Sequence, residues 1–151
     1  MDKNKKIGRY ERIYKQLSGL LNATDDMVSR MATVAAVLHH KMDGFFWTGF
    51  YLLSNETLLV GPYQGPVACQ VLARNTGVCW TGINQRKTII VTDVEQFPGH
   101  IACDSRSRSE IVVPVRDKDG QVIAILDVDS KHLNQFDEED AAGLEKIVGL
   151  I

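Results

Sequence analysis

Apolar positions recur at steps of three and four residues along the N-terminal part of the chain, which is typical of amphipathic helices. The first stripe predicts a helix that ends near Asn22 and consists of Ile7, Tyr10, Ile13, Tyr14, Leu17, Leu20 and Leu21. A second helix is expected after Thr24 as N-cap, with Asp25 and Asp26 at its positive end. Its apolar positions are Met27, Met31, Val34, Ala35 and Leu38. Two helices, over about residues 7–40, are therefore expected to lead the chain.

From residue 45 the apolar period changes to two, which predicts strands. We expect a buried strand over 45–53, a turn at 54–56 and a returning strand over 57–63, then a further strand over 87–94. Segments 110–116 and 121–130 flank the residues Asp-Lys-Asp-Gly and predict a β-hairpin. Asp137 is expected to cap a last helix, over about 137–151, with the apolar positions Ala141, Leu144, Ile147, Val148 and Ile151. Helices, an antiparallel sheet over about 45–130 and a closing helix predict an α+β fold in two or three layers, as one domain over 1–151.

Composition and net charge argue against some classes of function. The 151 residues carry a net charge of −2, which argues against partners such as nucleic acid or an anionic membrane surface. We find no run of about 18 apolar residues and no apolar segment behind the charged N-terminus, so secretion and membrane spanning are not expected. The sequence therefore predicts a cytoplasmic protein whose three cysteines rest as thiols. Small neutral or zwitterionic ligands remain open.

The second strand of the predicted hairpin places acids on an apolar face. Alternation puts Ile123, Ile125, Asp127 and Asp129 on one face, opposite the face of Val122, Ala124, Leu126 and Val128. A four-residue turn would set Glu110 opposite Asp127, a two-residue turn would set it opposite Asp129, and both registers put Glu110 on the acid face. Three carboxylates roughly 5 to 7 Å apart repel one another unless water or a cation compensates. The residues alone leave open solvated acids, a metal ion, a ligand ammonium group, or a carboxylic acid that keeps its proton as a donor.

Aromatic residues line one face of the strand at 45–53. Trp47, Gly49, Tyr51 and Leu53 share that face, so the glycine is expected to leave a slot between the indole and the phenol. Ordinary core packing is the alternative for these side chains, because Trp and Tyr usually supply buried area. The other aromatic residues of this segment are expected in the core, namely Phe45, Phe46 and Phe50.

The cysteines allow three interpretations. Cys103, within GHIACDSRSRSE, and Cys69, within GPVACQ, follow small residues in glycine-bearing loops, where a thiol kept only for packing is not expected, whereas Cys79 in GVCWTG is compatible with inert packing. The three cysteines with His100 would make a Cys3His zinc set, but this set lacks a C-x-x-C pair. In thiol redox chemistry, one thiolate attacks and is oxidised, and a second thiol rescues it through a disulfide.

Several segments resemble the free methionine-(R)-sulfoxide reductases, enzymes built on the GAF domain. They are FFWTGFYL, GPYQGPVAC, GVCWTG and FPGHIACDSRSRSEIVVPV followed by ILDVDS, in consistent order between Phe45 and Asp140. The resemblance implies a six-stranded antiparallel sheet with helices packed on one side and a small closed ligand pocket on the other. It implies an oxidoreductase that reduces free methionine-(R)-sulfoxide, with no bound cofactor and no metal, recycled by thioredoxin with thioredoxin reductase and NADPH.

Matched position by position, the resemblance assigns roles to individual residues. Cys103 corresponds to the attacking thiol, Cys69 to the resolving thiol and Cys79 to an auxiliary thiol. The substrate-binding residues it implies are Trp47, Tyr51, Glu110, Asp127 and Asp129, the same five to which strand alternation leads. One departure is Trp80, since GVC is typically followed by glycine, and an indole there is expected to change the mobility of that loop. A non-catalytic GAF domain that senses a small molecule is the alternative function, and the oligomeric state is left open, with a homodimer considered.

Overall fold

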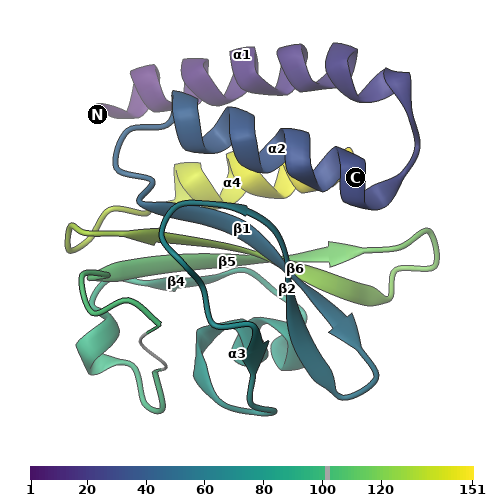
Figure 1. Cartoon of the computed structure of the whole chain (residues 1–151). Coiled ribbons are helices and arrows are strands. Elements are labelled where there is room, and N and C mark those ends of the chain that lie inside the picture. Colours follow the sequence, from purple (N-terminus) through teal and green to yellow (C-terminus); the bar gives the residue numbers. More distant parts are fainter. Residues whose placement is uncertain (101–102) are drawn as a thin grey trace.

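The chain forms one six-stranded antiparallel sheet with helices on both faces (Figure 1). The computed structural model describes residues 1–100 and 103–151. In chain order the elements are α1 (Lys3–Leu20), η1 (Leu21–Ala23), α2 (Met27–Lys41), β1 (Trp47–Ser54), β2 (Thr57–Gln64), β3 (Val71–Leu72), α3 (Gly77–Gln85), β4 (Ile89–Val91), η2 (Val94–Gln96), β5 (Ser109–Arg116), β6 (Val122–Ser130) and α4 (Glu138–Val148). The predicted α+β class is confirmed.

The sheet order is β3-β2-β1-β6-β5-β4, so β1 and β6 form its centre. In this pair Trp47 lies opposite Asp129 and Gly49 lies opposite Asp127. On the other side of β6, Glu110 of β5 also lies opposite Asp129. Three adjacent strands therefore bring the predicted aromatic and acidic residues together.

The β5–β6 hairpin pairs Glu110 with Asp129, which is one of the two predicted registers, but its turn differs from both of those considered. The connection over 117–121 has five residues, and an odd number by itself would reverse which side chains face the acids. The register shifts at the last pair of the hairpin and leaves Ile123 without a partner on β5, which restores the parity. As a result Ile123 packs on the helix-covered face and Val122 on the opposite face, the reverse of the prediction for these two residues.

Helices α1, α2 and α4 cover one face of the sheet and bury most of the apolar core there (Figure 1). The largest fully buried side chains of this layer are Ile13, Leu17, Met31, Val34, Leu38, Phe50, Ile111, Leu126, Leu144 and Ile147. The helical residues of this set lie on the predicted apolar stripes, because each amphipathic helix buries one face.

Two details of this layer correct the sequence analysis. Helix α2 begins at Met27 with Asp26, not Thr24, as its N-cap, since the Asp26 carboxylate accepts a hydrogen bond from the Ser29 N–H at 2.9 Å. Phe46 is not a core residue. It is only partly buried, and Arg106 and Lys131 lie over its ring at 4.8 Å and 5.0 Å from the centroid.

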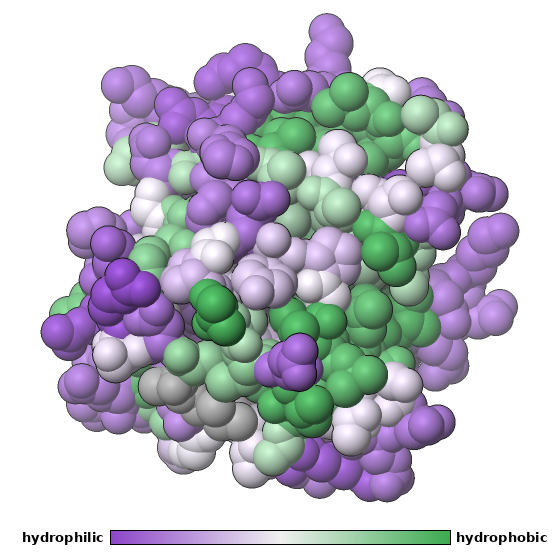
Figure 2. Space-filling model, in the orientation of Figure 1, coloured by the Kyte–Doolittle hydropathy of each residue, from purple (hydrophilic) through white to green (hydrophobic). Residues whose placement is uncertain are grey.

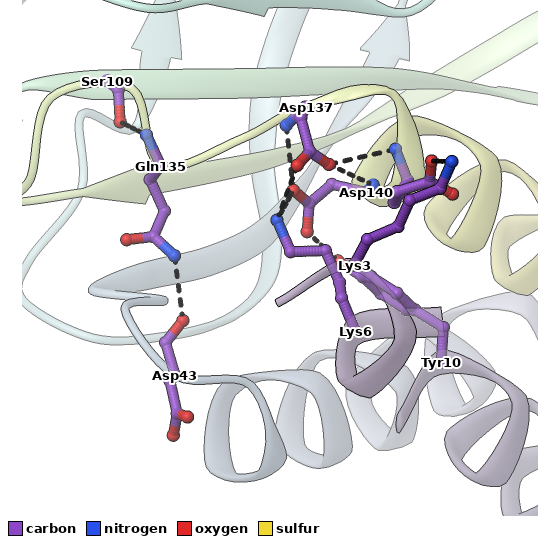
Figure 3. Close-up of polar contacts among 9 residues, drawn as sticks. Lys3, Lys6, Tyr10, Asp43, Ser109, Gln135, Asp137 and Asp140 are labelled. Atoms are coloured by element: carbon purple, nitrogen blue, oxygen red, sulfur yellow. Dashed lines mark hydrogen bonds and ion pairs between the residues drawn. The ribbon is translucent and has the colours of Figure 1, made fainter. Parts of the chain in front are cut away.

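A buried polar cluster joins α1 to the start of α4 (Figure 3). Lys6 donates to Asp140 Oδ2 at 2.7 Å, and the Tyr10 hydroxyl donates to Asp140 Oδ1 at 2.6 Å. The Asp137 N–H also donates to Asp140 Oδ2 at 2.9 Å, within a capping box in which Asp137 is the predicted N-cap. Burial alone would lower the pKa of Lys6, but the hydrogen bond to Asp140 and its charge outweigh this and raise it. Both oxygens of Asp140 are therefore satisfied within the protein.

The opposite face carries α3, a helix that the sequence analysis did not predict. Val78, Trp80 and Ile83 of α3 pack there with Val112 and Ile125 of the sheet. The predicted strand over 87–94 is shorter, because β4 spans only three residues and Val94 lies in η2. Among the described residues we find no helix that is long and apolar enough to cross a membrane.

Candidate active site

The predicted site residues meet in a pocket between the sheet and the start of α3. Seven of the eight line it, namely Trp47, Tyr51, Cys79, Cys103, Glu110, Asp127 and Asp129. The eighth, Cys69, is joined to Cys103 by a disulfide. The sequence-derived constellation is therefore one site in space, while the expected closure of the pocket stays a prediction.

Three carboxylates form the floor of this pocket. Glu110 and Asp127 are only 5% and 6% exposed, and Asp129 is partly buried beside them. Burial, together with the charge of Asp129, raises the pKa of Glu110 to about 8. Burial and the neighbouring acids also raise the pKa of Asp127 and of Asp129 well above the ordinary range. These shifts favour the protonated form of the acids in the pocket at a pH where exposed acids are ionised.

One oxygen of this floor has no partner within the described residues. Asp127 Oδ1 is buried and accepts no hydrogen bond there. An unsatisfied buried oxygen of this kind costs about 1 to 3 kcal/mol, so folds usually avoid it. Asp127 Oδ1 therefore points to a cationic or hydrogen-bond-donating ligand.

The disulfide links two loops at the rim of the pocket. Cys69 follows β2 and is half-buried, Cys103 precedes β5 and is exposed, and their Cα atoms lie 5.5 Å apart. Apolar side chains gather over β2 and the segment that follows it (Figure 2), and the exposed ones there are Leu59, Val67 and Val71. Because two of the three sulfurs bond to each other, the Cys3His zinc set is not assembled in this state.

Cys79 is the remaining free thiol and lies in the first turn of α3. It is 4% exposed, and burial followed by the charges of Asp127 and Glu110 raises its pKa. The segment that carries it is a helix and not the expected loop. Trp80 is buried in it and donates a hydrogen bond to the Leu72 carbonyl at 3.2 Å, so its indole packs the helix against β3.

The aromatic wall contains a third ring that the sequence analysis missed. Trp47 stacks on Tyr51 with a centroid separation of 5.8 Å and on Tyr63 of β2 with one of 5.2 Å. A Cβ atom on Gly49 would collide with Tyr63 and would come within 2.7 Å of the Trp47 ring. Gly49 thus makes room for aromatic packing, and the slot expected above it is filled.

The same wall holds the loop that carries Cys69. The Trp47 indole donates to the Pro66 carbonyl at 3.1 Å, and the Tyr51 hydroxyl donates to the Cys69 carbonyl at 3.0 Å. Gly65, at φ +122°, starts this loop in a conformation that favours glycine. Trp47 and Tyr51 therefore fix the backbone of the half-cystine as well as the pocket surface.

The sequence suggested a role for His100 only as a zinc ligand. In the structure His100 lies in the pocket beside Glu110. Its Nε2 lies 3.4 Å from Glu110 Oε1 inside the pocket, and burial lowers its pKa against the opposing charge of Asp127. Asp104 and Ser107 also line the pocket and were not predicted. The sequence signal for both residues was their position in the loop that carries Cys103. Loop residues have no periodicity, so the direction of their side chains could not be inferred.

Residues 24–151 match the profile of the GAF domain. The chain is 46% identical over its whole length to GAF domain-containing protein A of Dictyostelium discoideum, covering 95% of that protein. It is 37% identical over 92% of its length to the free methionine-R-sulfoxide reductase of Escherichia coli, of which 84% is covered.

Among solved structures, that of the free methionine-R-sulfoxide reductase from Neisseria meningitidis in complex with its substrate is 41% identical. It superimposes with a TM-score of 0.91 over 99% of this chain and 88% of its own. This chain therefore belongs to the GAF-domain family, in the group that contains the free methionine-R-sulfoxide reductases.

Proposed function

We propose that this protein reduces free L-methionine-(R)-sulfoxide to L-methionine. The observation that carries the proposal is a disulfide between Cys69 and Cys103 at the rim of a pocket whose floor holds a buried carboxylate oxygen that has no partner in residues 1–100 and 103–151. The related enzymes of Escherichia coli and Neisseria meningitidis support the same class of substrate. Oxidoreductase chemistry at the cysteines is thus combined with recognition of a cationic group.

The reaction begins when the Cys103 thiolate attacks the sulfoxide sulfur. A carboxylic acid, Asp127 or Asp129, donates a proton to the sulfoxide oxygen, which is otherwise a poor leaving group. The oxygen and this proton end on Cys103 as a sulfenic acid, and the sulfur of the substrate is reduced to the thioether of methionine. The raised pKa of both acids keeps a proton available for this step.

Cys69 then closes the oxidised state. Its thiol condenses with the sulfenic acid, which releases one water molecule and forms the disulfide. An external dithiol must return the disulfide to two thiols, and we propose thioredoxin, itself reduced by thioredoxin reductase and NADPH. Cys79 is proposed as an auxiliary thiol that enters disulfide exchange.

The remaining carboxylates bind the α-ammonium group of the substrate. Where Asp129 is the proton donor, Asp127 Oδ1, which has no hydrogen-bond partner among the described residues, accepts a hydrogen bond from this ammonium group. A methionine residue within a protein has an amide at this position, and leaving these buried acids without a cation opposes its binding by roughly 2 to 5 kcal/mol. The S-methyl group packs against Trp47, whose shape favours one sulfur epimer, and the names of the related reductases assign the R epimer.

Thioredoxin-coupled NADPH consumption tests the proposal. The substrates are free L-methionine-(R)-sulfoxide, the S epimer and N-acetyl-L-methionine-(R)-sulfoxide, with wild type and Cys103→Ser. We expect turnover of the free R form alone, and its complete loss in the variant. Absence of turnover in folded, reduced protein would favour the ligand-sensing GAF domain, in which Cys103→Ser leaves ligand affinity unchanged.

A further inference from the structure

The floor of the pocket contains a second arrangement besides the three acids. The Cys79 Sγ, one oxygen of Glu110 and one oxygen of Asp127 all lie within 4.8 Å of one another, and all three residues are buried. It is the one such cluster of ligating side chains in the part of the chain that the structure describes. A thiol and two carboxylates at this spacing are a donor set for a metal ion.

We propose that Cys79, Glu110 and Asp127 bind one divalent transition-metal ion of the Zn²⁺ type. A thiolate with two carboxylates suits an ion of intermediate softness better than Mg²⁺ or Ca²⁺, which prefer oxygen ligands alone. Zinc binds sulfur at about 2.3 Å and oxygen at about 2.0 to 2.2 Å, which separates tetrahedral ligand atoms by roughly 3.5 Å. Side-chain movements of about 1 Å therefore bring the three donors to bonding distance.

An independent observation supports a ligand at this point. Asp127 is 6% exposed, lines the pocket, and its Oδ1 has no hydrogen-bond partner among the described residues. Ion binding forms one metal–sulfur and two metal–oxygen bonds and releases the protons of the three groups to solvent. The two positive charges of the ion then offset two of the three negative charges of ligands that would otherwise repel one another.

The cluster supplies three ligands, whereas zinc in proteins usually takes four. His100 Nε2 lies 3.4 Å from Glu110 Oε1 and borders the three donors without belonging to them. Three protein ligands and one open position are typical of ions that exchange water or small ligands. Because Glu110 and Asp127 are also acids of the proposed ammonium site, the ion and an amino-acid ligand compete for them.

The disulfide provides a spectroscopic test. The chain has three cysteines, and two of them form the disulfide, so Cys79 is the one thiol left in the oxidised protein. Oxidised wild type is titrated with Co²⁺ and followed by absorption. We expect a thiolate-to-cobalt charge-transfer band that saturates at one Co²⁺ per chain and disappears on addition of Zn²⁺. Absence of the band, or its persistence in Cys79→Ser, would overturn the proposal.

A matched pair of variants tests the oxygen ligands. Asp127→Asn should weaken Co²⁺ binding on the order of tenfold or more, as loss of a ligand is at least as costly as loss of its supporting group. Asp119→Asn makes the same change on the exposed β5–β6 turn and should leave the affinity unchanged. Equal affinity in both variants, with native circular dichroism, would contradict the ligand role of Asp127.

This experiment is independent of the proposed reaction. It uses oxidised protein and contains no sulfoxide or reductant, so absence of metal binding leaves the reductase proposal intact. Conversely, a cobalt band in a protein that does not turn over methionine sulfoxide would support the metal site alone.

Discussion

Two buried acids on opposite faces of the same sheet differ in the hydrogen bonds that their carboxylate oxygens accept. Asp140, on the helix-covered face, receives hydrogen bonds from Lys6, Tyr10 and the Asp137 N–H (Figure 3). Asp127, on the pocket face, has an oxygen without any partner among the described residues. A buried carboxylate whose oxygens all have partners contributes to the structure. A buried carboxylate with an unpaired oxygen costs free energy, and only binding of a ligand or a proton offsets that cost.

The largest effect is expected from the same substitution at the two acids. Asp140→Asn leaves Lys6 buried with a weakened partner and should lower the free energy of unfolding by about 3 kcal/mol. Asp127→Asn removes an acid without a full set of partners, so stability should remain equal or increase. Urea denaturation of both oxidised variants measures the difference.

The same two variants should rank in the opposite order when KM for the free sulfoxide is measured. Asp127→Asn should raise KM for the free sulfoxide on the order of tenfold or more, since a charge-assisted hydrogen bond is worth about 1.5 to 3 kcal/mol. Asp140→Asn should leave KM unchanged per folded molecule. Equal losses of stability in the two variants, or equal values of KM, would show that the two faces do not differ in this way.

A smaller effect is expected from pH. Glu110 has a pKa of about 8 in the folded protein, above the 4.5 of an exposed glutamate, so between these values the folded state holds a proton that the unfolded chain has lost. The unfolded state then binds fewer protons, and stability must fall as pH rises. Wild type should therefore lose more stability than Glu110→Gln between about pH 5 and about pH 8. Parallel pH profiles from urea denaturation would argue against a protonated Glu110.

The smallest effect concerns the hydrogen bond that holds the Cys69 loop. Tyr51→Phe keeps the ring but loses the bond to the Cys69 carbonyl, which should slow disulfide closure about fivefold if the bond is worth about 1 kcal/mol. The ring that lines the pocket is retained, so methionine formation in the first turnover should change less than disulfide closure. Rapid quenching with a thiol-alkylating reagent separates the two steps.

Tyr63→Phe is the matched control for this prediction. The Tyr63 ring also stacks on Trp47, but its hydroxyl makes no hydrogen bond among the described residues. Disulfide closure should therefore proceed at the wild-type rate in this variant. An equal delay in both variants would assign the effect to ring packing and not to the anchored carbonyl.

Regular elements could be predicted because one periodic face of each is buried. The stripe from Tyr10 to Leu17 and the alternation from Ala124 to Asp129 both follow this rule, and the latter placed the acids on one face. The rule failed at Ile123, since a bulge depends on turn geometry that periodicity does not carry. It also missed Lys6, a charged residue buried within an apolar stripe, because its partner Asp140 is distant in the sequence.

The pocket residues also fall into a group that periodicity could predict and a group that it could not. Trp47, Tyr51, Glu110, Asp127 and Asp129 lie on strands, so alternation could place the acids on one face and the aromatic residues on one face of their own strand. That the two faces meet depends on the pairing of β1 with β6, which alternation does not give. The pairing of Cys69 with Cys103 came from the family resemblance alone, because loop residues have no period. Helix α3 was missed, as its glycines and β-branched residues weaken the helical signal, and with it the contact of Cys79 with the acids.

A single turnover without reductant tests the central claim most directly. Fully reduced protein receives one equivalent of free L-methionine-(R)-sulfoxide, and methionine and disulfide-linked peptides are then quantified by mass spectrometry. We predict one methionine per chain and a new Cys69–Cys103 bond, with Cys79 still alkylatable after denaturation. Unchanged sulfoxide with both thiols intact would contradict the account.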